Sequence, residues 1–210
     1  MITADLNGKT ALVTGGASGL GLAAVELFAE CGATVAISDV NEARINEQVA
    51  RLSGLGHKVI AAPADLRDPA AAQAMVDKAA GEMGRLDYLI NVAGHPVTLG
   101  IIPPSDLEGQ TEQLWSDIMS VNLMSVFRTA KAAAPYLKKS KGAIVSTSSM
   151  SGFRSGGSSS PYCVAKGAVA TLTKELARGL SPDVRVNAIA PMYVHPESTN
   201  FPLKWDTVFE

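Results

Sequence analysis

The chain has 210 residues and a formal net charge of −2, which excludes the strongly basic surface of a nucleic-acid or anionic-membrane binder. Hydrophobic residues make up 47% of it and aromatic residues only 5%, and no apolar run is long enough to span a membrane. We therefore expect one domain with a large core, located in the cytoplasm, with neither nucleic acid nor membrane as a partner. The two cysteines, Cys31 and Cys163, have no metal-binding or redox spacing, so we expect reduced thiols and no metal site.

Short apolar strands alternate with helical patterns along the whole chain. The expected strands cover residues 11–13, 35–37, 59–62, 88–92, 143–145 and 184–189. The expected helices cover residues 22–29, 41–52, 69–83, 111–139 and 161–180. Such alternation is typical of a parallel sheet with helices on both faces. With right-handed crossovers and a reversal after the third strand, it predicts a single doubly wound α/β domain, a Rossmann fold, over residues 1–194.

The first strand runs into a glycine turn, Thr14-Gly15-Gly16-Ala17-Ser18-Gly19-Leu20-Gly21, and a helical pattern follows. A strand, a glycine turn and a helix together form the context in which a glycine motif binds a dinucleotide. Gly15 permits the tight turn, and the helix N-terminus offers free N–H groups and a positive dipole end to a pyrophosphate. A glycine run can also be an ordinary loop, and the spacing here is Gly-x-x-x-Gly-x-Gly, not Gly-x-Gly-x-x-Gly.

The second strand ends in Asp39, close to twenty residues after the glycine turn. A carboxylate at this point can accept hydrogen bonds from a ribose 2′-hydroxyl and would repel a 2′-phosphate. The nearest cation, Arg44, fits better on a solvated helix face. These observations favour NAD over NADP as the cofactor.

A tyrosine and a lysine, Tyr162 and Lys166, are spaced so that both lie on one face of a helix. An ammonium beside a phenol favours the phenolate, so we expect the pKa of Tyr162 to fall below its ordinary value of about 10. A phenol tuned in this way can act as an acid or a base. Ser149, thirteen residues earlier, could polarise a substrate oxygen beside it. The same Tyr-x-x-x-Lys pattern also occurs on ordinary amphipathic helices.

In their order and spacing, these motifs resemble the short-chain dehydrogenase/reductase family from about Leu6 to Val194. The residues and segments that carry the resemblance are the glycine turn Thr14–Gly21, Asp39, Asp65-Leu66, Asn91-Val92-Ala93-Gly94, Asn122, Ser149, Tyr162, Lys166 and Arg185-Val186-Asn187-Ala188-Ile189-Ala190-Pro191. The resemblance implies an NAD(H)-dependent oxidoreductase that interconverts a secondary alcohol and a ketone by hydride transfer.

The resemblance also implies four catalytic residues. Tyr162 is the general acid or base, and Lys166 lowers its pKa and holds the nicotinamide ribose. Ser149 binds the substrate oxygen and stabilises the charge that develops on it; Ser148 competes for this role, but the spacing to Tyr162 favours Ser149. Asn122 positions a water for proton relay, although an asparagine that bonds backbone in a bent helix explains it equally well.

The remaining implied contacts are to the cofactor. The residues concerned are Gly15, Ser18, Gly19, Leu20, Gly21, Asp39, Asp65, Leu66, Asn91, Ala93, Gly94, Tyr162, Lys166, Pro191 and Val194. Asp65 and Leu66 are expected at the adenine, although Asp65 could simply end a strand before the helix that begins at Pro69. Val92 stands where the family usually has a second asparagine, which is a mild departure.

The similarity fails after Pro191. The family usually has a glycine and then a threonine at the positions of Met192 and Pro196. It also continues into a substrate-covering segment, a further helix and a seventh strand. We therefore expect residues 195–210 to be a residual substrate-loop tail, the last strand of the family to be missing, and the strand at 184–189 to form an exposed edge.

Three interpretations follow: an active enzyme, a noncatalytic dinucleotide-binding or oligomer-forming protein, and a shortened product of an enzyme. The catalytic set favours the first and third, and the short end favours the second and third. Because family members usually pair through their fifth and sixth helices, the expected partners are a small alcohol or ketone substrate and further copies of the chain, in a homodimer or homotetramer.

Overall fold

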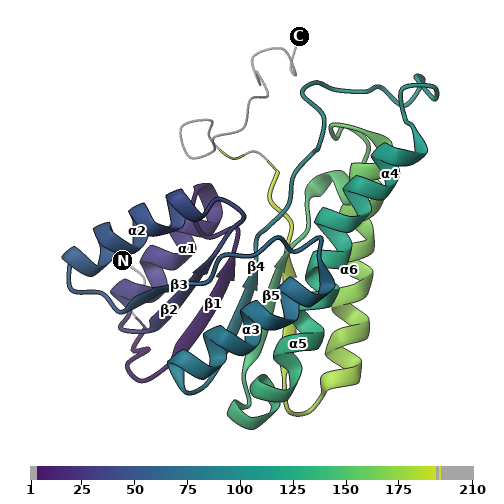
Figure 1. The fold of residues 1–210 in the computed structure, drawn as a ribbon. Helices are drawn as coiled ribbons and strands as arrows, with labels where there is room; N and C mark the ends of the chain where they lie inside the picture. Colours follow the sequence, from purple (N-terminus) through teal and green to yellow (C-terminus); the bar gives the residue numbers. More distant parts are fainter. Residues whose placement is uncertain (1–3, 193, 195–210) are drawn as a thin grey trace.

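Six parallel strands form one sheet in the order β3-β2-β1-β4-β5-β6 (Figure 1). The structure is a computed structural model that describes residues 4–192 and 194. The strands are β1 (Thr10–Thr14), β2 (Thr34–Ser38), β3 (Val59–Ala61), β4 (Tyr88–Asn91), β5 (Ala143–Thr147) and β6 (Arg185–Ile189). The order reverses between β3 and β4, because the chain returns to pair β4 with β1. This topology confirms the predicted doubly wound sheet.

Helices cover both faces of the sheet, as Figure 1 shows. The helices are α1 (Gly19–Glu30), α2 (Glu42–Gly54), α3 (Pro69–Met83), α4 (Glu112–Met119), α5 (Ser125–Ser140) and α6 (Ser160–Leu180). Successive residues of β1 point into different cores because side chains alternate along a strand. Ala11 and Val13 pack in the core that α1 and α2 cover, whereas Leu12 packs in the core that α3 and α5 cover.

Alanine is what allows α3 and α5 to lie close to each other and to the sheet. The alanines of these helices in that core are Ala72, Ala79, Ala80, Ala130, Ala132 and Ala133, all at most 3% exposed. A small side chain lets two backbones approach, and it loses no rotamer entropy when it is buried. The alanine-rich, aromatic-poor composition is therefore explained by close helix packing on a parallel sheet.

Side-chain caps set where several helices begin. The carboxylate of Asp68 accepts a hydrogen bond from Ala70 N at 2.8 Å, and Pro69 follows as the first residue of α3. Ser159 caps α6 in the same manner, and its hydroxyl accepts from Tyr162 N at 3.4 Å. The cap at Ser159 therefore fixes Tyr162 in the first turn of the helix.

The helical segment expected over residues 111–139 is present from Glu112 to Ser140, but it is not a uniform α-helix. The segment forms α4, then a π-helical turn, η1 (Ser120–Met124), and then α5. A π turn inserts one residue into the helical repeat, and such turns are frequent at functional sites. Asn122 lies inside this turn and is fully buried.

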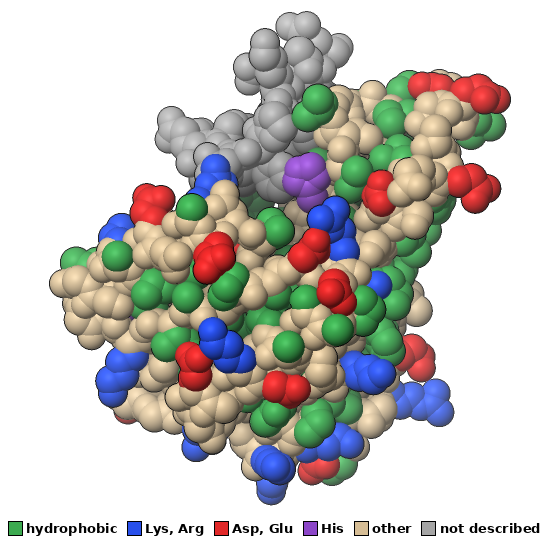
Figure 2. Space-filling view, in the orientation of Figure 1, with side chains coloured by type: hydrophobic (Ala, Val, Ile, Leu, Met, Phe, Trp, Pro, Cys, Tyr) green, Lys and Arg blue, Asp and Glu red, His purple; other side chains and the backbone are tan. Residues whose placement is uncertain are grey.

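The strand β6 lies at one edge of the sheet and pairs with β5 alone among the described residues. Arg185, Asn187, Ala188 and Ile189 are exposed on it, in agreement with the predicted exposed edge. On the face shown in Figure 2, basic and acidic side chains are interspersed. Within residues 4–192 and 194, no helix is long and apolar enough to cross a membrane.

Candidate active site

The carboxyl ends of β1, β4 and β5 meet at the edge of the sheet where the strand order reverses. Open α/β sheets bind ligands at this point, in the crevice outside the strand ends. The glycine turn follows β1, Asn91–Gly94 begins at the end of β4, and Ser149 follows β5. The fold thus gathers three motifs that are far apart in the sequence.

Glycine is required where the turn after β1 meets the loop after β4. Gly15 has φ +66°, and a Cβ on it would lie 2.8 Å from Ala93 N. A Cβ on Gly21 would overlap the carbonyl oxygen of Gly15. Any side chain at these two positions would force the turn away from α1 or from the β4 loop. The turn therefore keeps its backbone open at the N-terminus of α1, where a helix presents free N–H groups.

The two acids predicted to contact the cofactor lie after neighbouring strands. Asp39 follows β2 and accepts a hydrogen bond from Asn41 N at 3.1 Å. Asp65 follows β3 and binds the guanidinium of Arg67, with Nη2 and Oδ2 2.6 Å apart. The side-chain hydrogen bond from Arg67 holds the pKa of Asp65 below its ordinary value. Asp65 therefore stays ionised and already has a partner within its own loop.

Asn91 ends β4 with its side chain buried and bonded on both sides. Its Oδ1 accepts from the Thr129 hydroxyl at 2.8 Å, and its Nδ2 donates to Ser146 Oγ at 3.4 Å. These bonds join β4 to α5 and β5. Asn91 thereby fixes the end of the strand from which the Val92–Gly94 loop departs, and it does so as an interior residue, 2% exposed.

Asn122 holds the loop after β4 against the π turn. Its Oδ1 accepts from His95 N at 3.1 Å, and its Nδ2 donates to His95 O at 2.8 Å and to Ile118 O at 3.1 Å. The side chain is therefore committed to backbone groups, as in the alternative that it bonds backbone in a bent helix.

Lys166 lies at the centre of the site and is only 4% exposed. Its Nζ donates to Thr147 O at 3.0 Å. A Cβ on Gly94 would lie 3.0 Å from this Nζ and 2.8 Å from Asn122 Oδ1, so the glycine fits closely between the two side chains. Burial lowers the pKa of Lys166 from 10.5 to about 8. The ammonium thus titrates close to the range in which acid/base catalysts operate.

Tyr162 stands one helical turn before Lys166, whose Nζ lies 5.7 Å from the centre of its ring. Burial raises the pKa of Tyr162, a hydrogen bond with Ser149 acts in the opposite direction, and the neighbouring Cys163 adds to the rise. The expectation of a pKa lowered by Lys166 is therefore wrong for this structure. The physical reason is that the ammonium donates to Thr147 O, so desolvation of the phenol outweighs its influence.

Comparison with known proteins decides the family. The sequence pattern described as short chain dehydrogenase matches residues 9–205. The chain belongs to this family. A cis-3,4-dihydrophenanthrene-3,4-diol dehydrogenase of Alcaligenes faecalis is 37% identical over 89% of this chain and 66% of its own length. The 3-oxoacyl-[acyl-carrier-protein] reductase FabG of Thermotoga maritima is 34% identical over 92% and 77%.

The crystal structure of the protein gox2181 is similar, with a TM-score of 0.82 and 32% identity over 90% of this chain and 73% of that one. The family consists of oxidoreductases that bind a nicotinamide dinucleotide, so the site should accommodate such a cofactor. The residues present fit such a group. Glycine at Gly15 and Gly21 allows the tight turn after β1, because a Cβ at either position would collide with neighbouring backbone. Backbone N–H groups therefore stand at the N-terminus of α1, as the binding of a pyrophosphate requires.

The last two residues expected at the dehydrogenase cofactor follow β6. The carbonyl of Pro191 accepts from Met150 N at 3.0 Å, which ties this segment to the 3-10 turn η2 (Met150–Gly152) after β5. Val194 is half-buried. Pro196 and the expected tail at 195–210 lie outside the described residues, as does residue 193.

Two contacts of this dehydrogenase site were missed by sequence reasoning. Arg128 of α5 donates from Nη1 to Leu66 O at 2.9 Å, which joins the expected adenine loop to the helix after the π turn. Ser148 donates to the carbonyl of Lys166 at 2.7 Å. A polar run directly after the apolar strand 143–145 was the one available signal for Ser148. Arg128 gave none, because an arginine on an expected helix is ordinarily solvated.

Proposed function

We propose that the chain catalyses NAD(H)-dependent interconversion of a secondary alcohol and a ketone, with Tyr162 as the acid or base. The observation that carries the proposal is the meeting of three groups at the strand ends. The buried ammonium of Lys166 and the phenol of Tyr162 share one helix face, and Ser149, which follows the end of β5, interacts with the phenol and acts to lower its pKa. A nicotinamide dinucleotide supplies the hydride chemistry when it is bound.

Each of the chain's own groups has a distinct part in this proposal. Tyr162 donates its proton to a ketone oxygen in reduction and removes one from an alcohol in oxidation. Ser149 donates a hydrogen bond to the same oxygen and stabilises charge that develops there. Lys166 places a positive charge beside the phenol of Tyr162 and binds the ribose hydroxyls of the cofactor. Asn122 holds the π turn against the loop after β4. Exclusion of water by the buried surroundings strengthens these interactions.

Replacement of Tyr162 tests the reaction. Tyr162→Phe should reduce turnover of a panel of secondary alcohols with NAD to background, while the affinity for NADH, measured by fluorescence titration, stays nearly unchanged. Tyr136→Phe is the matched control. This tyrosine is on α5, and its hydroxyl donates to the Asp77 carboxylate at 2.7 Å, outside the candidate site. A Tyr162→Phe protein that keeps most of its activity would refute the assignment.

The choice of NAD over NADP rests on Asp39, whose carboxylate follows β2 at the position of a ribose ligand. Asp39→Ala should narrow the difference between the affinities for NADH and NADPH. Asp68→Ala serves as a control that also removes one carboxylate, because the side chain of Asp68 is engaged in capping α3. Unchanged preference in Asp39→Ala would mean that another group selects the cofactor.

The alternative is a noncatalytic protein that binds the dinucleotide or serves in an oligomer. NADH binding without turnover of any alcohol or ketone would favour it. A cytoplasmic location is part of our proposal, and it is supported by the two cysteines, Cys31 and Cys163, both of which are free thiols.

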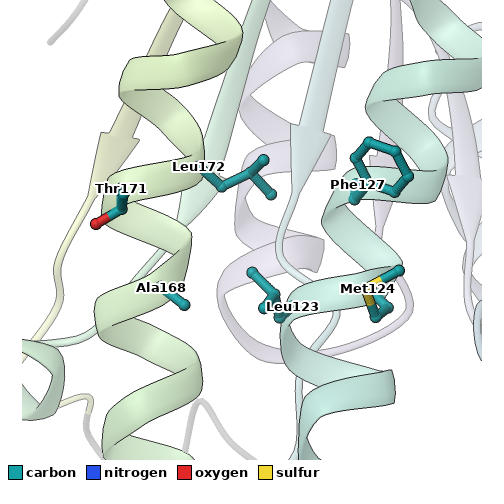
Figure 3. A pocket seen from close by; sticks show the side chains of 6 residues that line it. All are labelled: Leu123, Met124, Phe127, Ala168, Thr171 and Leu172. Carbon is teal, nitrogen blue, oxygen red and sulfur yellow. The ribbon is translucent and has the colours of Figure 1, made fainter.

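We also propose that two copies pair through α5 and α6. On each copy, an open apolar groove of about 530 Å³ lies between α6 and the segment formed by η1 and α5 (Figure 3). It is lined by Leu123, Met124, Phe127, Ala168, Thr171 and Leu172. Phe127 is 40% exposed, and an exposed apolar groove of this kind is typical of a surface that a partner covers. Phe127→Glu should halve the mass found by sedimentation, whereas Leu55→Glu, on an exposed residue after α2, should leave it unchanged.

A further inference from the structure

The residue before Ser149 makes a contact that none of the assigned roles uses. Ser148 is 2% exposed, and its hydroxyl donates to the backbone carbonyl of Lys166 at 2.7 Å. Inside a helix, this carbonyl also lies within reach of the N–H four residues later, and an oxygen with two lone pairs accepts both. The bond is thus an addition to the helix and joins its catalytic turn to the end of β5.

Lys166 is held at both ends by consecutive residues. Thr147 accepts from its Nζ at 3.0 Å, and Ser148 donates to its carbonyl. A lysine side chain is long and can adopt many rotamers. A contact at the ammonium alone would therefore not fix where the backbone of the helix turn lies. With both contacts, the end of β5 determines where the whole residue lies.

The strand end that makes these contacts is itself fixed. Ser148 N donates to Ile189 O at 2.8 Å, which continues the pairing of β5 with β6 by one residue. Four residues after Ser148, Gly152 lies against the same helical turn, where a Cβ on it would be 2.7 Å from the carbonyl carbon of Lys166. The segment after β5 therefore packs closely against α6 at Lys166 and Gly167.

We propose that Ser148 is a positioning residue that sets the placement of Lys166 and Tyr162 relative to Ser149. The proposal rests on the function proposed above and extends it to a residue outside the catalytic four. Tyr162 and Lys166 move together because they share one helix, whereas Ser149 belongs to the strand end. Without the Ser148 hydroxyl, the two elements keep their packing and lose the bond that aligns them.

Four variants separate this role from ordinary burial of a hydroxyl. Ser148→Ala removes the bond, and Ser148→Cys keeps the approximate shape with a much weaker donor. Ser148→Thr keeps the hydroxyl and should restore the wild-type behaviour. Thr173→Val is the matched control, since Thr173 is buried in α6 and its hydroxyl donates to the Val169 carbonyl at 2.8 Å, two turns beyond Lys166.

Turnover provides the first measurement. Ser148→Ala and Ser148→Cys should lower kcat by about tenfold to a hundredfold, because a misplacement of about 1 Å at reacting groups has effects of this size. KM for the alcohol should change far less, since Ser148 touches no substrate group. Thr173→Val should keep the kcat of the wild type. A kcat in the two Ser148 variants equal to that of Thr173→Val would overturn the proposal.

The second measurement does not need turnover. The titration of Lys166 is followed by NMR in protein with labelled lysine, where the wild type should titrate near its lowered pKa of about 8. In Ser148→Ala and Ser148→Cys the pKa should rise toward the ordinary lysine value, because a loosened turn admits water to the ammonium. An unchanged Lys166 titration in folded Ser148 variants would overturn the positioning proposal, whether or not the wild type is active. A wild type that turns over no alcohol would count against the proposed function instead.

Discussion

Removal of the Asn122 side chain should destabilise the protein more than its size suggests. The fully buried side chain makes three hydrogen bonds to backbone, two to His95 and one to Ile118. Asn122→Ala leaves three backbone groups without this partner. At about 1 kcal/mol for each lost bond, the free energy of unfolding should fall by about 3 kcal/mol.

The assay is urea unfolding followed by far-UV circular dichroism, with Asn41→Ala as the control. Asn41 is an exposed asparagine that caps α2 and accepts from Arg44 N at 3.1 Å, so its loss should cost about 1 kcal/mol. Hydrogen exchange gives a local readout, because the His95 amide that Asn122 accepts from should exchange faster in Asn122→Ala. A loss of stability no larger than that of Asn41→Ala would refute the reasoning.

Three further results are expected from single substitutions. Asp87→Asn should lower stability by about 2 kcal/mol at neutral pH, because the buried carboxylate binds Arg85 and the backbone of Thr10. Burial acts to raise the pKa of Asp87, but these donors hold it below its ordinary value. The contribution is therefore present above about pH 4 and lost as the pH falls through the folded pKa, so urea curves of variant and wild type should converge in acid. Gly81→Ala should raise the free energy of unfolding by about 0.5–1 kcal/mol in the same assay, since a Cβ there meets nothing within 4 Å in α3. Gly21→Ala should abolish NADH binding in a fluorescence titration, because a Cβ on residue 21 would overlap the Gly15 carbonyl. Gly81→Ala should bind NADH as the wild type does in the same titration.

The fold was predictable because local and global signals agree along this chain. Each apolar run became a strand, and caps such as Asp68-Pro69 placed a helix start at the residue indicated by the sequence. The glycine turn and the Asp39 position could be interpreted together, since both depend on one strand–turn–helix unit. Periodicity alone could not reveal the π turn at Asn122, because one inserted residue leaves the apolar spacing on either side nearly unchanged.

The candidate site was predictable in its members and less so in its electrostatics. The i, i+4 spacing places Tyr162 and Lys166 on one face, but it says nothing about how deeply each is buried. Desolvation then decides the direction of both pKa shifts, and it depends on packing from β4, β5 and η1. The contact of Ser148 with Lys166 was equally inaccessible, since it joins residues 18 positions apart through the docking of a helix on a strand end.

The order of the strands has a consequence for how the crevice forms during folding. Thr10 of β1 pairs with Thr34 of β2, 24 residues later, whereas Ala11 pairs with Tyr88 of β4, 77 residues later. Loop-closure entropy grows with the logarithm of the separation, so the β1–β4 junction costs about 1 kcal/mol more to close than the β1–β2 pair. Gly15 and Ala93 meet at that junction. The cleft is thus built on the most distant strand pairing in the sheet, and folding of either half alone leaves it unformed.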